Sequence, residues 1–230
     1  MKVKAIVVDM DGTITNFNLN FIEARKQALE ILNEMNLRTA DMTEQVSLYI
    51  ILGSLKEKLD PETYAKVRSR FYKLLEEMEL KSAKEVTLYP GARETLLAIR
   101  KRPVKMGMVT NNGRAGTDLT FKRLKLEGIF DVVVTRDDCE DMKPSPNPVL
   151  KVMIGLGANP EEGILVGDGL MDIMAAKRAG LSSVAVTTGP FNSARLIEAE
   201  PDYLLGSIND LPGLLDLITE TGEVTRRIEP

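Results

Sequence analysis

The chain has 230 residues and a formal net charge of −4, with one cysteine and no histidine. This length suits one large or two small domains, and the acidic balance argues against a nucleic-acid or membrane-surface partner. The lack of histidine excludes a Ser-His-Asp triad, a Cys-His pair and histidine-ligated zinc or haem, and a single cysteine excludes an internal disulfide framework. Catalysis must therefore rely on carboxylates, lysine, tyrosine, hydroxyls or a metal bound by oxygen.

The first residues do not have the pattern of a targeting segment. Lys2 and Lys4 precede a short apolar run, residues 5–8, which ends at Asp9. A secretory signal has a longer apolar region, and a membrane span needs about 20 apolar residues. We therefore expect a cytoplasmic protein.

Short runs rich in β-branched residues predict buried strands. They lie at residues 3–8, 105–109, 132–135, 164–166 and 184–187, with a short further strand at 204–205. Helical patterns lie between the later runs, at residues 92–100, 115–126, 147–156 and 171–179. This alternation predicts an α/β fold with a doubly wound, Rossmann-like core and a mostly parallel sheet. The polar tail from Thr219 is expected to be frayed.

Between the first two predicted strands the pattern is helical only. Apolar residues recur at helical spacing from Phe21 to Leu32 and again around Val46, Tyr49 and Ile50. A third helix is expected to begin at Asp60-Pro61, a favourable pair for a helix start. The sequence predicts a small all-helical cap domain at residues 17–88, inserted into a core domain formed by residues 1–16 and 89–230.

Chemically active side chains follow several of the predicted strands. They occur in Asp9-Met10-Asp11-Gly12-Thr13, Thr110-Asn111-Asn112-Gly113, Lys143-Pro144-Ser145-Pro146 and Gly167-Asp168-Gly169-Leu170-Met171-Asp172. Ligands of open parallel sheets bind beyond the carboxyl ends of the strands, so these segments would meet there. Clustered carboxylates need a cation, and Mg²⁺ is the usual one beside a phosphate. Lys143, the Thr110 hydroxyl and loop amides would then bind an anion, which is the arrangement of phosphoryl transfer.

Taken alone, these segments have other interpretations. Asp9-x-Asp11-Gly12 is also a common turn, but it fails as a calcium loop because Ile14 and Asn20 stand where glycine and glutamate are needed. Gly167-Asp168-Gly169 lacks the third glycine of a dinucleotide-binding pattern.

The four segments together resemble the haloacid dehalogenase superfamily, in the family's order and over almost the whole chain. The resemblance implies a phosphatase with a helical cap, similar to phosphoglycolate phosphatases. It implies that Asp9 is the nucleophile and that Asp11 is the acid and base. Mg²⁺ would be bound by Asp9, the Asp11 carbonyl, Asp168 and Asp172. The phosphoryl group would be held by residues of three segments: Gly12, Thr110, Asn111 and Lys143.

The implied function is Mg²⁺-dependent hydrolysis of phosphate monoesters of a small metabolite through an aspartyl-phosphate. Asp11 favours phosphoester chemistry over dehalogenation, which has no leaving oxygen to protonate. Since no imidazole is present, proton transfer falls to Asp11, and we expect Asp9 and Asp11 to titrate as a coupled pair.

Two alternatives stay open. One is a sugar-phosphate mutase of the same superfamily, which the lack of a cap histidine disfavours. The other is a non-catalytic phosphate-binding regulatory domain, which multiple turnovers would exclude. The substrate, the pathway, the oligomeric state and the resting position of the cap do not follow from the sequence.

Substrate choice is expected to depend on the cap. Gly53-Ser54-Leu55-Lys56 breaks the helical pattern, and by resemblance such a cap loop reaches into the active site. Gly53, Ser54 and Lys56 are therefore candidate specificity residues. The alternative is a simple turn between helices.

Overall fold

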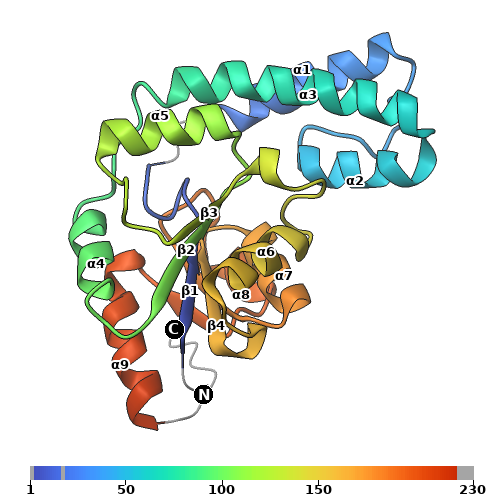
Figure 1. The fold of residues 1–230 in the computed structure, drawn as a ribbon. Helices are drawn as coiled ribbons and strands as arrows, with labels where there is room; N and C mark the ends of the chain where they lie inside the picture. Colours follow the sequence, from blue (N-terminus) through green and yellow to red (C-terminus); the bar gives the residue numbers. More distant parts are fainter. Residues whose placement is uncertain (1–2, 17–18, 222–230) are drawn as a thin grey trace.

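The computed structural model describes residues 3–16 and 19–221, and its strands form one parallel sheet in the order β3-β2-β1-β4-β5-β6 (Figure 1). The strands are β1 (Ala5–Val8), β2 (Lys105–Val109), β3 (Val132–Val134), β4 (Gly163–Gly167), β5 (Ser182–Val186) and β6 (Tyr203–Leu205). The chain winds from β1 outward to β3, then crosses back to β4 and winds outward to β6. The order therefore reverses between β1 and β4, and the crevice beyond their carboxyl ends is where such sheets bind ligands.

Helices cover both faces of the sheet (Figure 1). One face carries α4 (Ala92–Ile99), α5 (Arg114–Leu124) and α9 (Leu211–Thr221), and the other carries α6 (Asn147–Leu156), α7 (Leu170–Ala179) and α8 (Ser193–Glu198). Successive side chains of a strand point to opposite faces, so Ile6 and Val8 of β1 join one hydrophobic cluster and Ala5 and Val7 join the other. Among the described residues, three short 3₁₀ helices lie in the connections, at Arg136–Asp138, Pro160–Glu162 and Ile208–Asp210.

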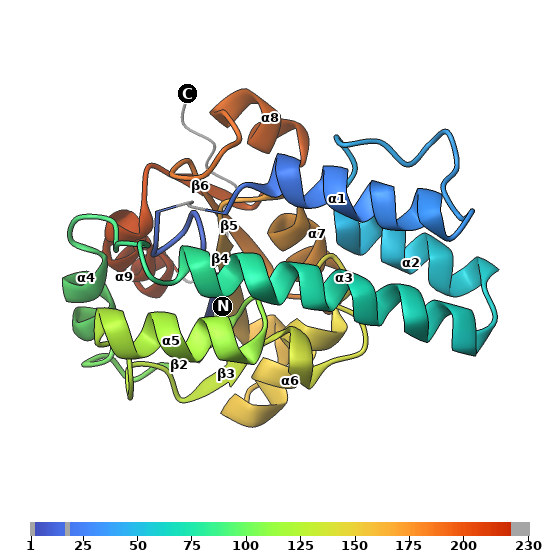
Figure 2. The same ribbon diagram turned by 90° about the horizontal axis from the view of Figure 1, so that it is seen from above.

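The inserted segment forms a helical cap over the carboxyl ends of the strands (Figures 1 and 2). Its helices are α1 (Phe21–Glu34), α2 (Leu48–Lys58) and α3 (Pro61–Ser82). The Asp60 side chain caps α3, as its sequence predicts, by accepting from the backbone N–H groups of Glu62 and Thr63. The cap has a hydrophobic cluster of its own, with Phe71 fully buried in it.

The structure confirms the predicted α/β fold class and the inserted helical cap. It also confirms the short strand predicted at residues 204–205. The loop predicted at Gly53–Lys56 is wrong, because α2 continues through these residues; Gly53 lies on its exposed side, where a glycine interrupts no packing. The boundaries of the two domains stay a prediction, and their junction at residue 17 lies outside the described residues. The tail expected to be frayed from Thr219 begins as helix, because α9 continues to Thr221; the residues after it lie outside the described part of the chain. None of the helices in the described part of the chain is long and apolar enough to cross a membrane.

Candidate active site

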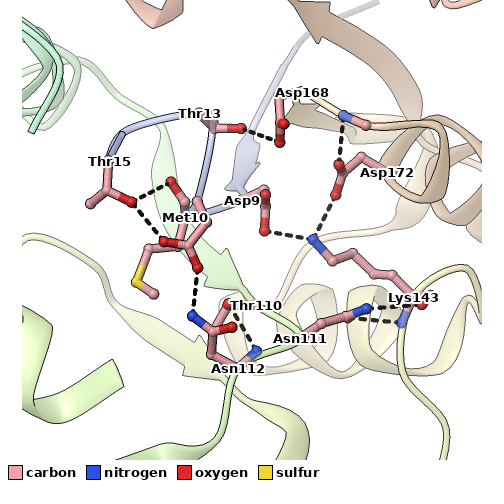
Figure 3. A network of polar contacts seen from close by, with 12 residues as sticks. Asp9, Met10, Thr13, Thr15, Thr110, Asn111, Asn112, Lys143, Asp168 and Asp172 are labelled. Carbon is pink, nitrogen blue, oxygen red and sulfur yellow. Dashed lines mark hydrogen bonds and ion pairs between the residues drawn. The ribbon is translucent and has the colours of Figure 1, made fainter. Parts of the chain in front are cut away.

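Asp9 and Asp11 lie in the turn that follows β1, at the point where the strand order reverses. The Asp9 N–H donates to the Val166 carbonyl at 2.9 Å, which continues the pairing of β1 with β4 by one residue. The chain then folds back, since the N–H groups of Ile14 and Thr15 both donate to the Met10 carbonyl. The turn therefore leaves both carboxylates at the carboxyl end of the sheet, where Figure 3 shows Asp9.

Lys143 joins two of the predicted site residues. Its Nζ lies 2.6 Å from Asp9 Oδ1 and 2.6 Å from Asp172 Oδ1, and its side chain is buried. Asn111 supports the backbone of Lys143: its side chain donates to the Lys143 carbonyl at 3.0 Å and accepts from the Lys143 N–H at 3.2 Å (Figure 3). The Asn111 side chain is thus a support for Lys143, so any contact of Asn111 with a phosphoryl group falls to its backbone.

Asp9, Asp168 and Asp172 form a buried cluster that could hold a metal ion. Each offers one carboxylate oxygen, and these oxygens lie within 4.8 Å of one another. Thr13 donates to Asp168 at 3.4 Å, and the Gly169 N–H donates to Asp172 Oδ2 at 3.1 Å. One ammonium stands against three carboxylates here. Because a hard divalent cation prefers carboxylate oxygens, the donor set and the excess negative charge both fit such an ion.

Burial raises the pKa of Asp9 to about 7, although Lys143 lowers it; Asp172 and, to a smaller extent, Asp11 raise it. Burial, together with Asp9 and Asp172, also raises the pKa of Asp168 well above its ordinary value. Burial alone would lower the pKa of Lys143, but its two carboxylate partners hold that pKa above the usual value. The Lys143 ammonium is therefore charged in the folded protein. Its single positive charge cannot balance three ionised carboxylates in the cluster.

Asp11 lies apart from this cluster and has partners of its own. The Thr15 hydroxyl donates to Oδ1 at 2.9 Å and the Asn112 side chain donates to Oδ2 at 2.5 Å (Figure 3). Burial raises the pKa of Asp11, and these two hydrogen bonds oppose the shift. Its predicted contact with a metal through the backbone carbonyl stays a prediction.

Thr110 follows β2 and is buried. Its N–H donates to the Val134 carbonyl at 3.0 Å, and its hydroxyl accepts from the Asn112 N–H at 3.2 Å. The structure thus brings Asp9, Asp11, Thr110, Lys143, Asp168 and Asp172 to one edge of the sheet.

Sequence reasoning missed several supporting residues. Asn112 lies in the segment 110–113 and Thr15 lies two residues beyond Thr13, but the motifs do not predict the hydrogen bonds of these two side chains to Asp11. The turn after β5 contains no motif that predicts a place at the site. In the structure its Thr188 hydroxyl donates to the Gly12 carbonyl at 2.5 Å, and Gly189 packs against Asp168.

The cap candidates lie away from the carboxylate cluster. The Lys56 ammonium pairs with Asp141 at 2.9 Å and Glu140 at 3.1 Å, on the loop before Lys143. Ser54 is half-buried, and the space beside Gly53 is open. Their part in substrate choice stays a prediction. A different cap residue reaches the site: the Tyr49 hydroxyl of α2 donates to the Asn111 carbonyl.

The sequence pattern of haloacid dehalogenase-like hydrolases matches residues 6–186, which include Asp9, Asp11, Thr110, Lys143, Asp168 and Asp172. The chain belongs to this family. It is therefore a hydrolase, as the four segments predicted.

Relatives of this hydrolase match over nearly their whole length. It is 31% identical to pyrophosphatase PpaX of Bacillus cereus over 217 residues, which are 94% of this chain and 97% of that protein. It is 31% identical to pyrophosphatase PpaX of Bacillus mycoides over 222 residues, 95% and 99% of the two chains. The crystal structure of a hydrolase from Pseudomonas syringae superposes with a TM-score of 0.70 at 25% identity, covering 94% and 99%.

Proposed function

We propose that this hydrolase removes a phosphoryl group from a small phosphorylated molecule with the help of Mg²⁺. One observation carries the proposal: Lys143 holds both Asp9 and Asp172, beside Asp168, at the reversal of the strand order. A buried ammonium and a buried carboxylate cluster in one place match a substrate that is an anion and a cofactor that is a cation.

The metal would be held by the carboxylates of Asp9, Asp168 and Asp172, with the Asp11 backbone carbonyl as a further oxygen ligand. Carboxylates and carbonyls suit Mg²⁺, which leaves several positions to water and phosphate. When bound, the ion would offset the negative charge of the substrate phosphate and of the clustered carboxylates.

Asp9 would act as the nucleophile. Lys143 engages its Oδ1, which orients the carboxylate and leaves Oδ2 to attack phosphorus. The bond from this oxygen to phosphorus forms as the bond to the leaving oxygen breaks, and the product is an aspartyl-phosphate. The Thr110 hydroxyl and the Lys143 ammonium would bind the oxygens of the transferring group.

Asp11 would supply and then remove the proton. Burial raises the pKa of Asp11, which favours its protonated form, and Asp11 would pass its proton to the leaving oxygen. In the second half of the reaction the ionised Asp11 would take a proton from a water molecule. That water attacks phosphorus, and the bond to Asp9 breaks to release phosphate.

Two substrate classes are favoured. The PpaX relatives are named pyrophosphatases, which favours inorganic pyrophosphate. The resemblance to phosphoglycolate phosphatases favours small phosphate monoesters such as phosphoglycolate. A panel with Mg²⁺ that contains pyrophosphate, phosphoglycolate, sugar phosphates and nucleotides would rank them by kcat/KM.

The nucleophile is tested by Asp9→Asn, assayed with Mg²⁺ on p-nitrophenyl phosphate and on the best substrate of the panel. We expect turnover to fall at least about 10³-fold, because the amide cannot form the covalent intermediate. Asp118→Asn, on the exposed side of α5, is the matched control and should keep full activity. Substantial turnover by Asp9→Asn would remove Asp9 from this role.

A further inference from the structure

The peptide group between Asn111 and Asn112 is held from one side by two donors. The Asn111 carbonyl accepts from the Tyr49 hydroxyl and from Arg136 Nη1, the latter at 3.2 Å. In a trans peptide the carbonyl and the following N–H point in opposite directions. Fixing this carbonyl toward Tyr49 and Arg136 therefore directs the Asn112 N–H away from them, toward the Thr110 hydroxyl oxygen, 3.2 Å from the Asn112 nitrogen.

The orientation of this peptide group affects two side chains of the site, the Thr110 hydroxyl and the Asp11 carboxyl group. Because the Thr110 oxygen accepts from Asn112, its own hydrogen is free to be donated to a phosphoryl oxygen. The same Asn112 donates through its side chain to Asp11 at 2.5 Å. A rotation of the peptide would misdirect the Thr110 hydroxyl and disturb the carboxyl group that handles the proton.

Arg136 is fixed in turn by the cap. It is 1% exposed and forms a two-pronged ion pair with Glu79 of α3, in which Nη2 lies 3.0 Å from Oε2. The same Glu79 oxygen accepts from the Gly113 N–H at 2.9 Å, and the ring of Tyr72 lies 4.8 Å from the guanidinium carbon. Arg136 Nη1 also donates to the Tyr49 hydroxyl at 3.4 Å. Residues of α2 and α3 thus form hydrogen bonds with the 110–113 turn of the core.

Stability alone does not account for this arrangement. A buried ion pair often contributes no more than apolar residues of the same volume. Here Nη1 of the paired Arg136 also donates to the Asn111 carbonyl of the turn and to the Tyr49 hydroxyl, which itself donates to that carbonyl. We propose that Tyr49 and Arg136 are positioning residues. Their hydrogen bonds fix the orientation of the Asn111–Asn112 peptide group, and through this group the cap orients the side chains of Thr110 and Asp11. The proposal rests on the phosphatase function proposed above.

The mildest test is Tyr49→Phe, which keeps the ring and removes one donor from the Asn111 carbonyl. We expect kcat for p-nitrophenyl phosphate to fall about 10-fold, in line with the loss of one hydrogen bond to a group needed in the transition state, while KM changes less than about 2-fold. Tyr64→Phe is the matched control. Tyr64 lies in the cap cluster on α3, and no hydrogen bond of the described residues joins its hydroxyl to the turn. It should leave both constants unchanged.

A second variant tests Arg136 without leaving a buried charge. Arg136→Met alone would strand Glu79, so the double variant Arg136→Met with Glu79→Met is compared, since an apolar pair can replace a buried ion pair at little cost. We expect it to fold and to lose about 100-fold or more in kcat, because the carbonyl then keeps only the Tyr49 donor and Gly113 loses its acceptor. Wild-type kcat in the folded double variant would overturn the proposal.

A binding measurement separates this proposal from the function on which it rests. Calorimetric titration of inorganic phosphate in the presence of Mg²⁺ needs no turnover. We expect Tyr49→Phe to bind phosphate within about 2-fold of the wild type, in line with its expected KM, and Tyr64→Phe to match the wild type. Equal phosphate affinity and equal kcat in Tyr49→Phe and the wild type would overturn the positioning role. A wild type that binds phosphate but hydrolyses no phosphate ester or anhydride would instead overturn the proposed function.

Discussion

Gly189, in the turn after β5, brings its backbone against the carboxylate of Asp168. A Cβ atom at this position would stand 1.8 Å from Asp168 Oδ2, well inside any permitted contact. Gly12 also lies against this carboxylate: a Cβ atom there would lie 2.2 Å from Oδ2, and its φ of +84° also favours glycine. Two backbone segments thus hold Asp168 in place where a metal would be bound.

Gly189→Ala should therefore weaken the binding of Mg²⁺. The added methyl group must push the Asp168 carboxylate aside, and disturbing the support of a metal ligand costs about 10–100-fold in metal affinity. The measurement is the Mg²⁺ concentration that gives half-maximal hydrolysis, together with direct calorimetric titration of Mg²⁺.

Gly213→Ala is the control, because Gly213 lies in α9 with no atom near the added methyl group. Alanine is the better helix former, so this variant should keep its Mg²⁺ affinity and fold at least as well. If Gly189→Ala needs no more Mg²⁺ than the wild type, Gly189 does not position Asp168.

At the scale of single residues, the sequence predicts the charged groups of the site but not the residues that position these groups. Asp9, Lys143 and Asp168 stand in segments with a recognisable chemical pattern. Tyr49, Arg136 and Gly189 stand in none, and their partners are far along the chain: Tyr49 and Arg136 are 87 positions apart. Only the folded arrangement shows that a tyrosine in the cap touches a turn of the core.

Among the elements, continuous apolar runs predicted every strand of the described sheet, because strands buried on both faces have no polar side. The failures have local causes. Gly53 suggested a break in α2, yet on an exposed helix side a glycine costs only about 1 kcal/mol and is tolerated. Helix α9 is not predicted because Pro212 and Gly213 disfavour a helix. Its apolar residues nevertheless have helical spacing, and a proline in the first turn is compatible with a helix. In α8 only Leu196 is buried, so little periodicity was there to find.

Helices α1, α2 and α3 of the cap share one hydrophobic cluster, and Phe71 of α3 is its largest fully buried side chain. Phe71→Ala should lower the free energy of unfolding by about 3–5 kcal/mol, since it removes a buried ring and leaves a cavity. Urea unfolding followed by circular dichroism measures this loss. Because Tyr49 and Glu79 belong to the same helices, activity should fall at a lower urea concentration than in the wild type.

Ile22→Ala is the control for the cap cluster, because Ile22 lies on α1 with 65% of its surface exposed. Its loss should change the free energy of unfolding by less than about 0.5 kcal/mol. A loss below about 1 kcal/mol for Phe71→Ala would mean that the cluster contributes little to the stability of the cap.

For the whole molecule, the order of the strands places the site and the cap closes over it. The sequence predicted that the site lies at the carboxyl edge of the sheet, since that follows from parallel strands alone. How the cap is seated depends on buried polar contacts between distant segments, such as Glu79 with Arg136, and these have no periodic signature. Pairwise contacts of this kind are read only from the folded chain.

The buried carboxylates link stability to pH across the whole molecule. The pKa of Asp9 is raised to about 7 and that of Asp168 well above 3.8, chiefly by burial. Between about pH 4 and pH 7 the folded metal-free protein therefore binds more protons than the unfolded chain, and its stability falls as the pH rises through this window. Asp131 and Asp138 have lowered pKa values, so their contribution is lost only below about pH 4. No histidine titrates in the window.

Mg²⁺ should reverse this loss, because it binds the ionised carboxylates of the folded state only and stabilises it by mass action. In EDTA the melting temperature should fall between pH 5.5 and pH 8.5, and the increase caused by millimolar Mg²⁺ should be larger at pH 8.5. Differential scanning calorimetry at both pH values measures both effects. Asp168→Asn, which removes one ligand and its titration, should reduce both the loss in EDTA and the gain with Mg²⁺, while the surface change Asp118→Asn should alter neither. An Mg²⁺-dependent increase that is equal at the two pH values would show that the clustered carboxylates do not bind the ion in competition with protons.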